Sequence, residues 1–140
     1  MKRTIAALAW TALLTASGLA ADLVAMTRDV AAKEGVPGDL IVAIVRHESG
    51  FNPKARGKQG EIGLVQIKCG TAKGIGYRGT CAQLYDPRTN LTYGARYLRA
   101  ALERTSGDWC KAASLYQAGL GARPRASKYC HKVMASLASN

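Results

Sequence analysis

The spacing of apolar residues predicts that segment 37–49 is a helix with one buried face. Ile41, Ile44 and Val45 recur at positions i, i+3 and i+4, and Glu48 continues the same stripe at i+7. A carboxyl group on that stripe is directed toward the interior or into a cleft, where burial raises its pKa and suits it to act as a general acid near neutral pH. The alternative is a helix-terminal glutamate that bends out to solvent, and periodicity alone leaves both open.

Residues typical of helix ends mark the limits of this helix and of several others. Pro37 stands near its start, Asp39 is placed to cap it, and Gly50 is placed to close it. Asp86, directly before a proline, and Asp108 indicate two further helix starts. No long stretch alternates with period two, so the expected fold class is all-α, a single compact helical domain with a cleft. The expected helices are residues 21–33, 37–49, 87–104, 109–118 and 126–137, with a short helix at 62–71, a turn at 80–84, and loops at 50–61 and 70–79.

Composition indicates one compact domain with a strong positive charge. The 140 residues are enough for one domain, and a hydrophobic fraction of 48% is enough for a core. The 20 Lys and Arg residues against 9 Asp and Glu give a formal net charge of +11. Such a chain is attracted to polyanions, which include nucleic acid, anionic lipid and acidic cell-wall polymers, and charge alone does not choose among them.

The N-terminus has the organisation of a secretory signal peptide. Met1 is followed by two basic residues, and residues 5–16 form an apolar stretch too short to span a bilayer comfortably. Small residues then precede a cleavage position after Ala20. We therefore expect residues 1–20 to be removed and residues 21–140 to form a periplasmic or secreted domain without stable membrane insertion. The alternative is an uncleaved anchor.

The cysteines predict two disulfides. An even number of cysteines in an exported domain is typical of a disulfide framework, and four cysteines allow three pairings. We favour Cys69 with Cys81 and Cys110 with Cys130, because each pair then closes a short loop between neighbouring elements. A metal site is the rival interpretation, but the spacings differ from those of zinc ligands, and His131 lies directly beside Cys130. We expect no metal and no cofactor.

Four blocks of the sequence stand out together: Glu48-Ser49-Gly50-Phe51-Asn52-Pro53, Gly63-Leu64-Val65-Gln66, Asn90 with Gly94 and Tyr97-Leu98, and Leu115-Tyr116-Gln117-Ala118-Gly119. In their order and spacing, these blocks resemble the family 1 lytic transglycosylases. The resemblance covers about residues 22–131 and implies a lysozyme-like helical fold, shared with goose-type lysozymes. It also implies peptidoglycan glycan strands, rather than nucleic acid, as the partner.

The resemblance also implies roles for individual residues. Glu48 matches the single catalytic acid of the family, and Ser49 matches the serine that helps to place the sugar. Gln66 matches the glutamine that lines the cleft, and Tyr116 matches the tyrosine over the acid. Gln117 stands where the family has asparagine, which keeps the amide but alters the hydrogen bonding at that corner. From the residues alone, ordinary polarity at a helix end and in a loop is the favoured interpretation of Ser49 and Gln66, and the site roles come from the resemblance.

The number of available acids bears on the reaction. Most glycoside hydrolases use two carboxyl groups, and among the 9 acids only Glu61 is a candidate partner for Glu48. We interpret Glu61 as a loop residue. A single acid fits the reaction that the resemblance implies, in which Glu48 acts first as acid and then as base and leaves 1,6-anhydromuramoyl ends. The alternatives are a hydrolytic muramidase and a non-catalytic cationic wall-binding protein. By analogy alone, a small exported form also suits a secretion or flagellar apparatus, and we expect a monomer.

Overall fold

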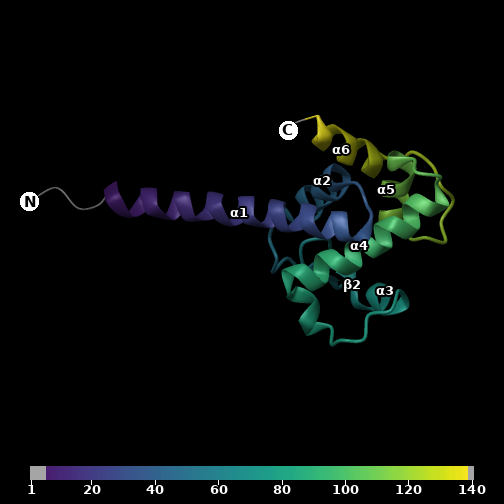
Figure 1. The fold of residues 1–140 in the computed structure, drawn as a ribbon, viewed down its shortest axis with the longest axis horizontal. Coiled ribbons are helices and arrows are strands. Elements are labelled where there is room, and N and C mark those ends of the chain that lie inside the picture. Colours follow the sequence, from purple (N-terminus) through teal and green to yellow (C-terminus); the bar gives the residue numbers. More distant parts are fainter. Residues whose placement is uncertain (1–5, 139–140) are drawn as a thin grey trace, which may run out of the picture.

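The structure is a computed structural model that describes residues 6–138, with side chains from residue 17 onward. It begins with a long helix, α1 (Ala6–Glu34), whose first half extends away from the remaining elements (Figure 1). The helix expected at residues 21–33 is the second half of α1. The first five residues of the predicted signal peptide lie outside the described residues, and its predicted cleavage position lies within α1. Within residues 6–138, no helix combines the length and the apolar character needed to cross a membrane.

The body of the molecule is a set of packed helices, which confirms the all-α fold class. α2 (Gly38–Ser49) packs against α1 and against α6 (Lys128–Leu137). α4 (Pro87–Arg104) packs against α1 and against α5 (Trp109–Ala118), and α5 also contacts α6. This arrangement makes α2 the inner helix, and all residues from position 40 to position 45 are buried. The helix that carries Glu48 is therefore firmly fixed in the core.

The two ends of α2 differ in how they are capped. Gly50 adopts a left-handed φ of 57° and donates its backbone N–H to Arg46 O at 3.1 Å, which confirms it as the end of the helix. Asp39 was expected to cap the other end, and this prediction is wrong. Pro37 occupies the N-cap position, and Asp39 lies inside the first turn, where its carboxylate pairs with Arg28 at 2.7 Å. A negative charge in the first turn still interacts favourably with the helix dipole.

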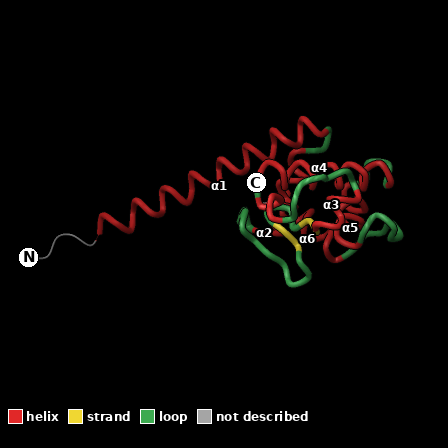
Figure 2. Tube along the Cα trace, turned by 90° about the horizontal axis from the view of Figure 1, so that it is seen from below, coloured by secondary structure: helices red, strands yellow, loops and turns green. Residues whose placement is uncertain are grey.

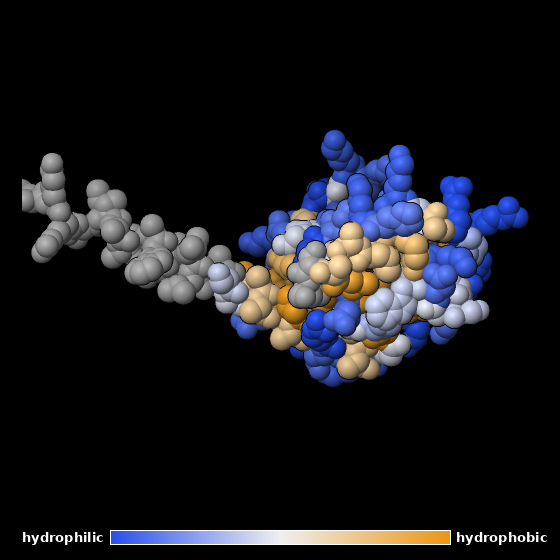
Figure 3. Space-filling model, turned by 90° about the horizontal axis from the view of Figure 1, so that it is seen from above, coloured by the Kyte–Doolittle hydropathy of each residue, from blue (hydrophilic) through white to orange (hydrophobic). Residues whose placement is uncertain are grey.

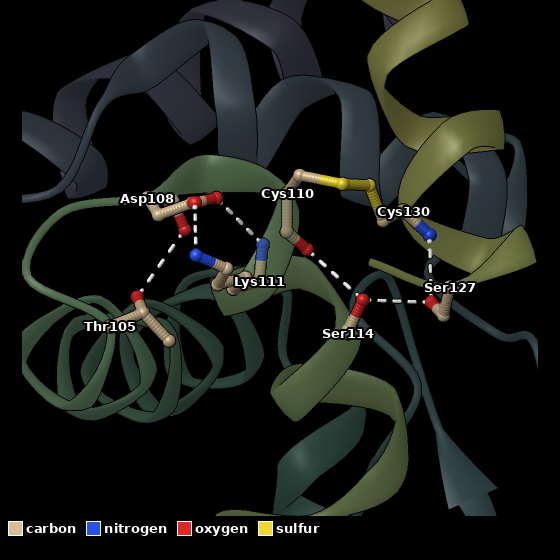
Figure 4. Close-up of a disulfide and its surroundings, with 7 residues drawn as sticks. All are labelled: Thr105, Asp108, Cys110, Lys111, Ser114, Ser127 and Cys130. Atoms are coloured by element: carbon tan, nitrogen blue, oxygen red, sulfur yellow. Dashed lines mark hydrogen bonds and ion pairs between the residues drawn. A yellow bond between two sulfur atoms is a disulfide. The ribbon is translucent and has the colours of Figure 1, made fainter. Parts of the chain in front are cut away.

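The caps of the later helices agree with the sequence. The carboxylate of Asp86 accepts a hydrogen bond from the N–H of Thr89 at 2.9 Å and starts α4. Asp108 accepts a hydrogen bond from Lys111 N at 2.9 Å and starts α5 with the predicted bounds (Figure 4). The last helix begins two residues later than expected, because the hydroxyl of Ser127 caps it.

The predicted helix at residues 62–71 is wrong. The chain there forms a short antiparallel hairpin of β1 (Glu61–Ile62) and β2 (Ile67–Lys68), followed by the helix α3 (Cys69–Gly74), which occupies part of the loop expected at residues 70–79. Gly63 and Gln66 have positive φ values of 73° and 50°, which no α-helix accommodates. Figure 2 shows the short strands in yellow among red helices and green loops. The turn expected at residues 80–84 is the 3₁₀ helix η1 (Ala82–Tyr85).

Two disulfides connect neighbouring elements, as predicted. The Cys69–Cys81 bond has a Cα–Cα distance of 5.4 Å and ties the start of α3 to the residue before η1. The Cys110–Cys130 bond has a Cα–Cα distance of 4.9 Å and ties α5 to α6 (Figure 4).

The surface combines charged side chains with a limited apolar area. Figure 3 shows one face, on which an apolar region coloured orange is bordered by hydrophilic side chains coloured blue. Among the large apolar side chains that the structure describes, Leu19 and Trp109 are the exposed ones. Most of the buried apolar residues lie in one continuous core.

Replacing either cysteine pair by alanines should lower the free energy of unfolding by about 3 kcal/mol, because each bond limits the entropy of the unfolded chain. The closed loops are of similar size, with sequence separations of 12 and 20, so the two effects should be comparable. Denaturant unfolding of both double variants tests this. Four free thiols in the intact mass of the protein from an oxidising compartment would contradict the assignment.

Candidate active site

A cleft of about 600 Å³ opens between the end of α2, the β-hairpin and the ends of α5 and α6. Of the predicted site residues, it brings together Glu48, Gln66, Tyr116 and Gln117. Ser49 is not on the cleft wall. The lining residues are His47, Glu48, Lys58, Gln59, Glu61, Gln66, Ile67, Lys68, Thr71, Tyr97, Tyr116, Gln117, Ala118, Gly119 and Tyr129.

The carboxyl group of Glu48 lies in this cleft, as the apolar stripe of its helix predicts. Burial is the largest influence on its pKa and raises it above the ordinary value. Hydrogen bonding from Tyr129 and the nearby His47 act in the opposite direction, while the charge of Glu61 adds to the rise. The net upward shift keeps Glu48 protonated to a higher pH than an exposed glutamate, which is the property of a general acid.

The hydroxyl of Tyr129 donates a hydrogen bond to Glu48 Oε1 at 2.5 Å. Tyr129 is buried near the start of α6, and its ring contacts that of His47 edge to face, with centroids 5.1 Å apart. Burial, followed by the charge of Glu48, raises the pKa of Tyr129, so its hydroxyl remains a donor. Sequence reasoning missed this residue. The available indication was its position next to Cys130, whose disulfide fixes the helix start.

Ser49 does not line the cleft but forms hydrogen bonds with backbone groups next to it. Its hydroxyl lies 2.8 Å from the carbonyl oxygen of Leu64 and 3.2 Å from that of Val45. It therefore joins the end of α2 to the turn between β1 and β2. That turn also carries Gln66, whose side-chain amide donates to the carbonyl oxygens of Ala55 at 3.2 Å and Gly63 at 3.0 Å.

Tyr116 forms a second link to the same turn. Its hydroxyl donates to the carbonyl oxygen of Val65 at 2.9 Å, and its ring meets that of Tyr97 edge to face at 5.4 Å between centroids. Burial, followed by the charge of Glu48, raises the pKa of Tyr116 well above its ordinary value, so the ring stays neutral beside the acid. Gln117 is exposed on the cleft wall, and its amide has no hydrogen-bond partner among residues 17–138.

The side chain of Asn90 on α4 holds the turn between β1 and β2 in place. Its side-chain oxygen accepts a hydrogen bond from Val65 N at 3.0 Å, and its side-chain nitrogen donates to Ile62 O and Leu84 O, both at 2.9 Å. Asn90 is fully buried on α4. A Cβ on Gly63 would lie 2.6 Å from Asn90 Nδ2, so glycine is needed for this close approach as well as for the positive φ.

Glu61 brings a second carboxyl group into the cleft. It lies on β1 and on the cleft wall, so its assignment to a loop is wrong. Backbone hydrogen bonds, first its own and then that of Gln59, lower its pKa, and Lys68 Nζ lies 3.9 Å from its Oε1. The N–H of Gln59 donates to Glu61 Oε2 at 3.0 Å. The surroundings therefore favour the ionised form of Glu61 and the protonated form of Glu48.

The described residues contain one close group of metal-ligand types, formed by Cys110, Cys130 and His131. The two sulfurs are joined in a disulfide and have no thiolate to offer a metal ion. This group is distinct from the cleft residues.

The transglycosylase SLT domain model matches residues 25–136, and the chain therefore belongs to this family. The helical fold agrees with that of the lytic transglycosylase Slt from Pseudomonas aeruginosa, solved as an inactive glutamate-to-glutamine mutant, with a TM-score of 0.72 and 27% identity over 81% of this chain and 23% of that chain. The 70 kDa soluble lytic transglycosylase from Escherichia coli gives a TM-score of 0.64 and 26% identity over 81% of this chain and 18% of that chain.

Among curated proteins, the chain is similar to the endo-type membrane-bound lytic murein transglycosylase A of Salmonella paratyphi B. The two are 42% identical over 71 residues, which is 46% of this chain and 35% of the relative. The chain thus spans about a third of that curated relative and less than a quarter of the solved Slt chain.

Substituting Tyr129 by phenylalanine should raise the pKa of Glu48 further. The hydroxyl of Tyr129 stabilises the ionised carboxylate through a hydrogen bond, and the substitution removes that bond. An NMR titration of the labelled Glu48 carboxyl carbon measures the shift. Tyr97→Phe is the matched control, since the Tyr97 hydroxyl accepts a hydrogen bond from Leu120 N. An unchanged or lower pKa in the Tyr129 variant would contradict the role of this hydroxyl.

Proposed function

We propose that this protein is an exported peptidoglycan lytic transglycosylase. It cleaves the β-1,4 bond between N-acetylmuramic acid and N-acetylglucosamine and leaves 1,6-anhydromuramoyl ends. The observation that carries the proposal is Glu48, a carboxyl group with a raised pKa, held in a cleft by the hydroxyl of Tyr129. Membership of the SLT family and the names of the relatives support the same activity.

Glu48 acts twice in the proposed reaction. In its protonated form it donates its proton to the glycosidic oxygen, and the bond to the muramoyl C1 breaks. The N-acetyl group of the substrate stabilises the cationic centre at C1. The Glu48 carboxylate then accepts the proton of the muramoyl C6 hydroxyl as the C6 oxygen bonds to C1, so no water is consumed and the acid is regenerated. Burial favours the first step, and the hydrogen bond from Tyr129 stabilises the carboxylate needed in the second.

The other predicted residues hold the glycan or the wall that holds it. Gln66 and Gln117 present amides at the cleft surface, and the free amide of Gln117 is available to sugar hydroxyl and N-acetyl groups. Tyr116 offers a fixed ring beside the acid. Ser49 places the end of α2 against the hairpin turn and acts on the substrate through that turn.

A hydrolytic muramidase is the second candidate, and the position of Glu61 favours it. Glu61, whose pKa is lowered, lies in the same cleft as Glu48, whose pKa is raised, and two-acid glycosidases divide their roles between such a pair. The two reactions give different products, because anhydromuramoyl ends weigh one water less than reducing ends. Mass analysis of digested wall separates them.

Export follows from the proposed signal peptide at residues 1–20, with residues 21–140 as the mature SLT domain in the periplasm or outside the cell. The proposed partner is the glycan strand, and the protein acts as a monomer. A role of this protein in a secretion or flagellar apparatus rests only on analogy with other small exported forms. A non-catalytic wall-binding protein would retain the cleft but release no product from wall.

Glu48→Gln should abolish wall cleavage, because an amide neither donates nor regains the proton. General acid–base help from one group is typically worth about 10²- to 10⁴-fold, and Glu48 supplies it in two steps. The substituted amide oxygen can still accept the hydrogen bond from Tyr129, so the fold should persist. The variant should also be more stable than the parent at neutral pH, since the buried carboxylate is gone. This advantage should fade as the pH falls through the raised pKa of Glu48 toward 4.5, where the parent is protonated in both states.

Glu61→Gln is the matched control and should keep most of the activity. Release of soluble muropeptides from purified wall, analysed by mass, measures both variants. Near wild-type cleavage by Glu48→Gln would refute the one-acid mechanism. Equal inactivity of Glu61→Gln together with reducing ends in the parent digest would favour the muramidase.

The mature protein should begin near Ala21. The proposed cut after Ala20 removes the basic and apolar N-terminal residues and reduces the positive charge by the contribution of Lys2 and Arg3. The intact mass of the protein recovered from the periplasm of an expressing cell, with N-terminal peptide mapping, tests this. A retained N-terminus in the exported protein would contradict cleavage.

A further inference from the structure

The cleft contains one lysine whose charge has no partner in the described part of the chain. Lys68 pairs with the carboxylate of Glu61 and donates to Gln59 Oε1 at 3.0 Å. Lys58 lies on the same wall of the cleft, but its ammonium has no hydrogen bond or ion pair with any residue from 17 to 138. The two acids of the cleft are otherwise engaged, Glu48 by Tyr129 and Glu61 by Gln59 and Lys68. Lys58 is thus an uncompensated positive charge facing the substrate space.

The backbone beneath Lys58 is held in a tight turn. Gly57 N donates to Glu61 O at 2.9 Å, and Gly60 N donates to Gly57 O at 3.2 Å. Gly60 has a φ of 85°, and a Cβ on Gly57 would overlap the carboxylate of Glu61. These contacts fix the Cα of Lys58 on the cleft wall and leave only its side chain to move. The ammonium is therefore tethered close to any glycan bound in the cleft.

We infer that Lys58 is a specificity residue that binds a carboxylate projecting from a muramoyl residue of the bound strand. This inference rests on the proposed function, because that function places muramoyl residues in the cleft. Each muramoyl residue carries a lactyl ether, whose carboxylate is free on a stripped strand and amide-linked to a peptide on an intact one. The peptide carries carboxylates of its own. The same lysine has nothing comparable to bind on an unsubstituted N-acetylglucosamine polymer, which is neutral.

The exposure of Lys58 sets the size of the expected loss of affinity. Lys58 lines the cleft and is exposed, so its interaction with a carboxylate is weakened by water and by salt. Losing such a pair should weaken binding by about two- to fivefold at low salt, and the difference should shrink at 1 M salt. A reversed charge should weaken binding more than a neutral side chain does.

The test measures dissociation constants in the Glu48→Gln background, so that no ligand is consumed. The ligands are a peptide-bearing tetrasaccharide of the wall, the same tetrasaccharide stripped by an amidase, and chitotetraose. Lys58→Met and Lys58→Glu are compared with Lys54→Met, which removes a neighbouring exposed charge that is not on the cleft wall. Thermal unfolding confirms that each variant is folded. Cleavage by the wild-type protein is measured separately, so a failure of the proposed activity is distinguishable from a failure of this inference.

We expect the Lys58 variants to lose affinity for the carboxylate-bearing ligands and to bind chitotetraose as the parent does. A loss confined to the stripped ligand assigns the lactyl carboxylate, and a loss confined to the intact ligand assigns a peptide carboxylate. An equal loss for all three ligands, no loss for any of them, or an equal effect of Lys54→Met would overturn the inference.

Discussion

The cleft depends on one buried amide, the side chain of Asn90. Its three hydrogen bonds hold the turn of the β-hairpin against α4, and the carbonyl groups of that turn then receive the other parts of the site. Leu64 O accepts from Ser49, which fixes the end of α2, and Val65 O accepts from Tyr116, which fixes the end of α5. An apolar side chain in place of Asn90 would leave buried backbone groups unpaired, at a cost of about 1–3 kcal/mol each. The helices that border Glu48 are thus positioned through the short turn of the hairpin.

The pKa values of the two carboxyl groups in the cleft are shifted in opposite directions, because their surroundings differ. Glu48 is surrounded by rings and buried chain, so burial dominates and its pKa rises. Glu61 lies only a few residues from the turn but receives backbone N–H donors and a lysine, so its pKa falls. The charge of Glu61 also disfavours ionisation of Glu48. The hairpin therefore influences the protonation of Glu48 through Glu61.

Sequence reasoning succeeded where the controlling interactions are local and failed where they are not. Asp108 caps a helix through an N–H three residues away, and the stripe that carries Glu48 has the period of its own helix, so both are visible in the sequence. The interval 62–71 was mistaken for a helix because its apolar residues are too few to reveal a two-residue strand. Gln66 adopts a positive φ there, and glutamine is not a residue type that predicts this conformation. Tyr129 was missed because its partner lies 81 positions away, and its place beside Cys130 indicates a fixed position but does not identify Glu48 as the partner.

The position of Tyr129 shows how the end of the chain completes a site that begins near its start. α6 is held to α5 by the Cys110–Cys130 bond and by the hydroxyls of Ser114 and Ser127, which lie 2.8 Å apart (Figure 4). These links leave the first turn of α6 little freedom, and the hydroxyl of Tyr129 is therefore fixed over Glu48. Without it, burial and the charge of Glu61 would be opposed only by the nearby His47, and the Glu48 carboxylate would lose this hydrogen-bond donor. Burial and this donor shift the pKa of Glu48 in opposite directions, and the donor comes from α6 while the carboxyl group lies on α2.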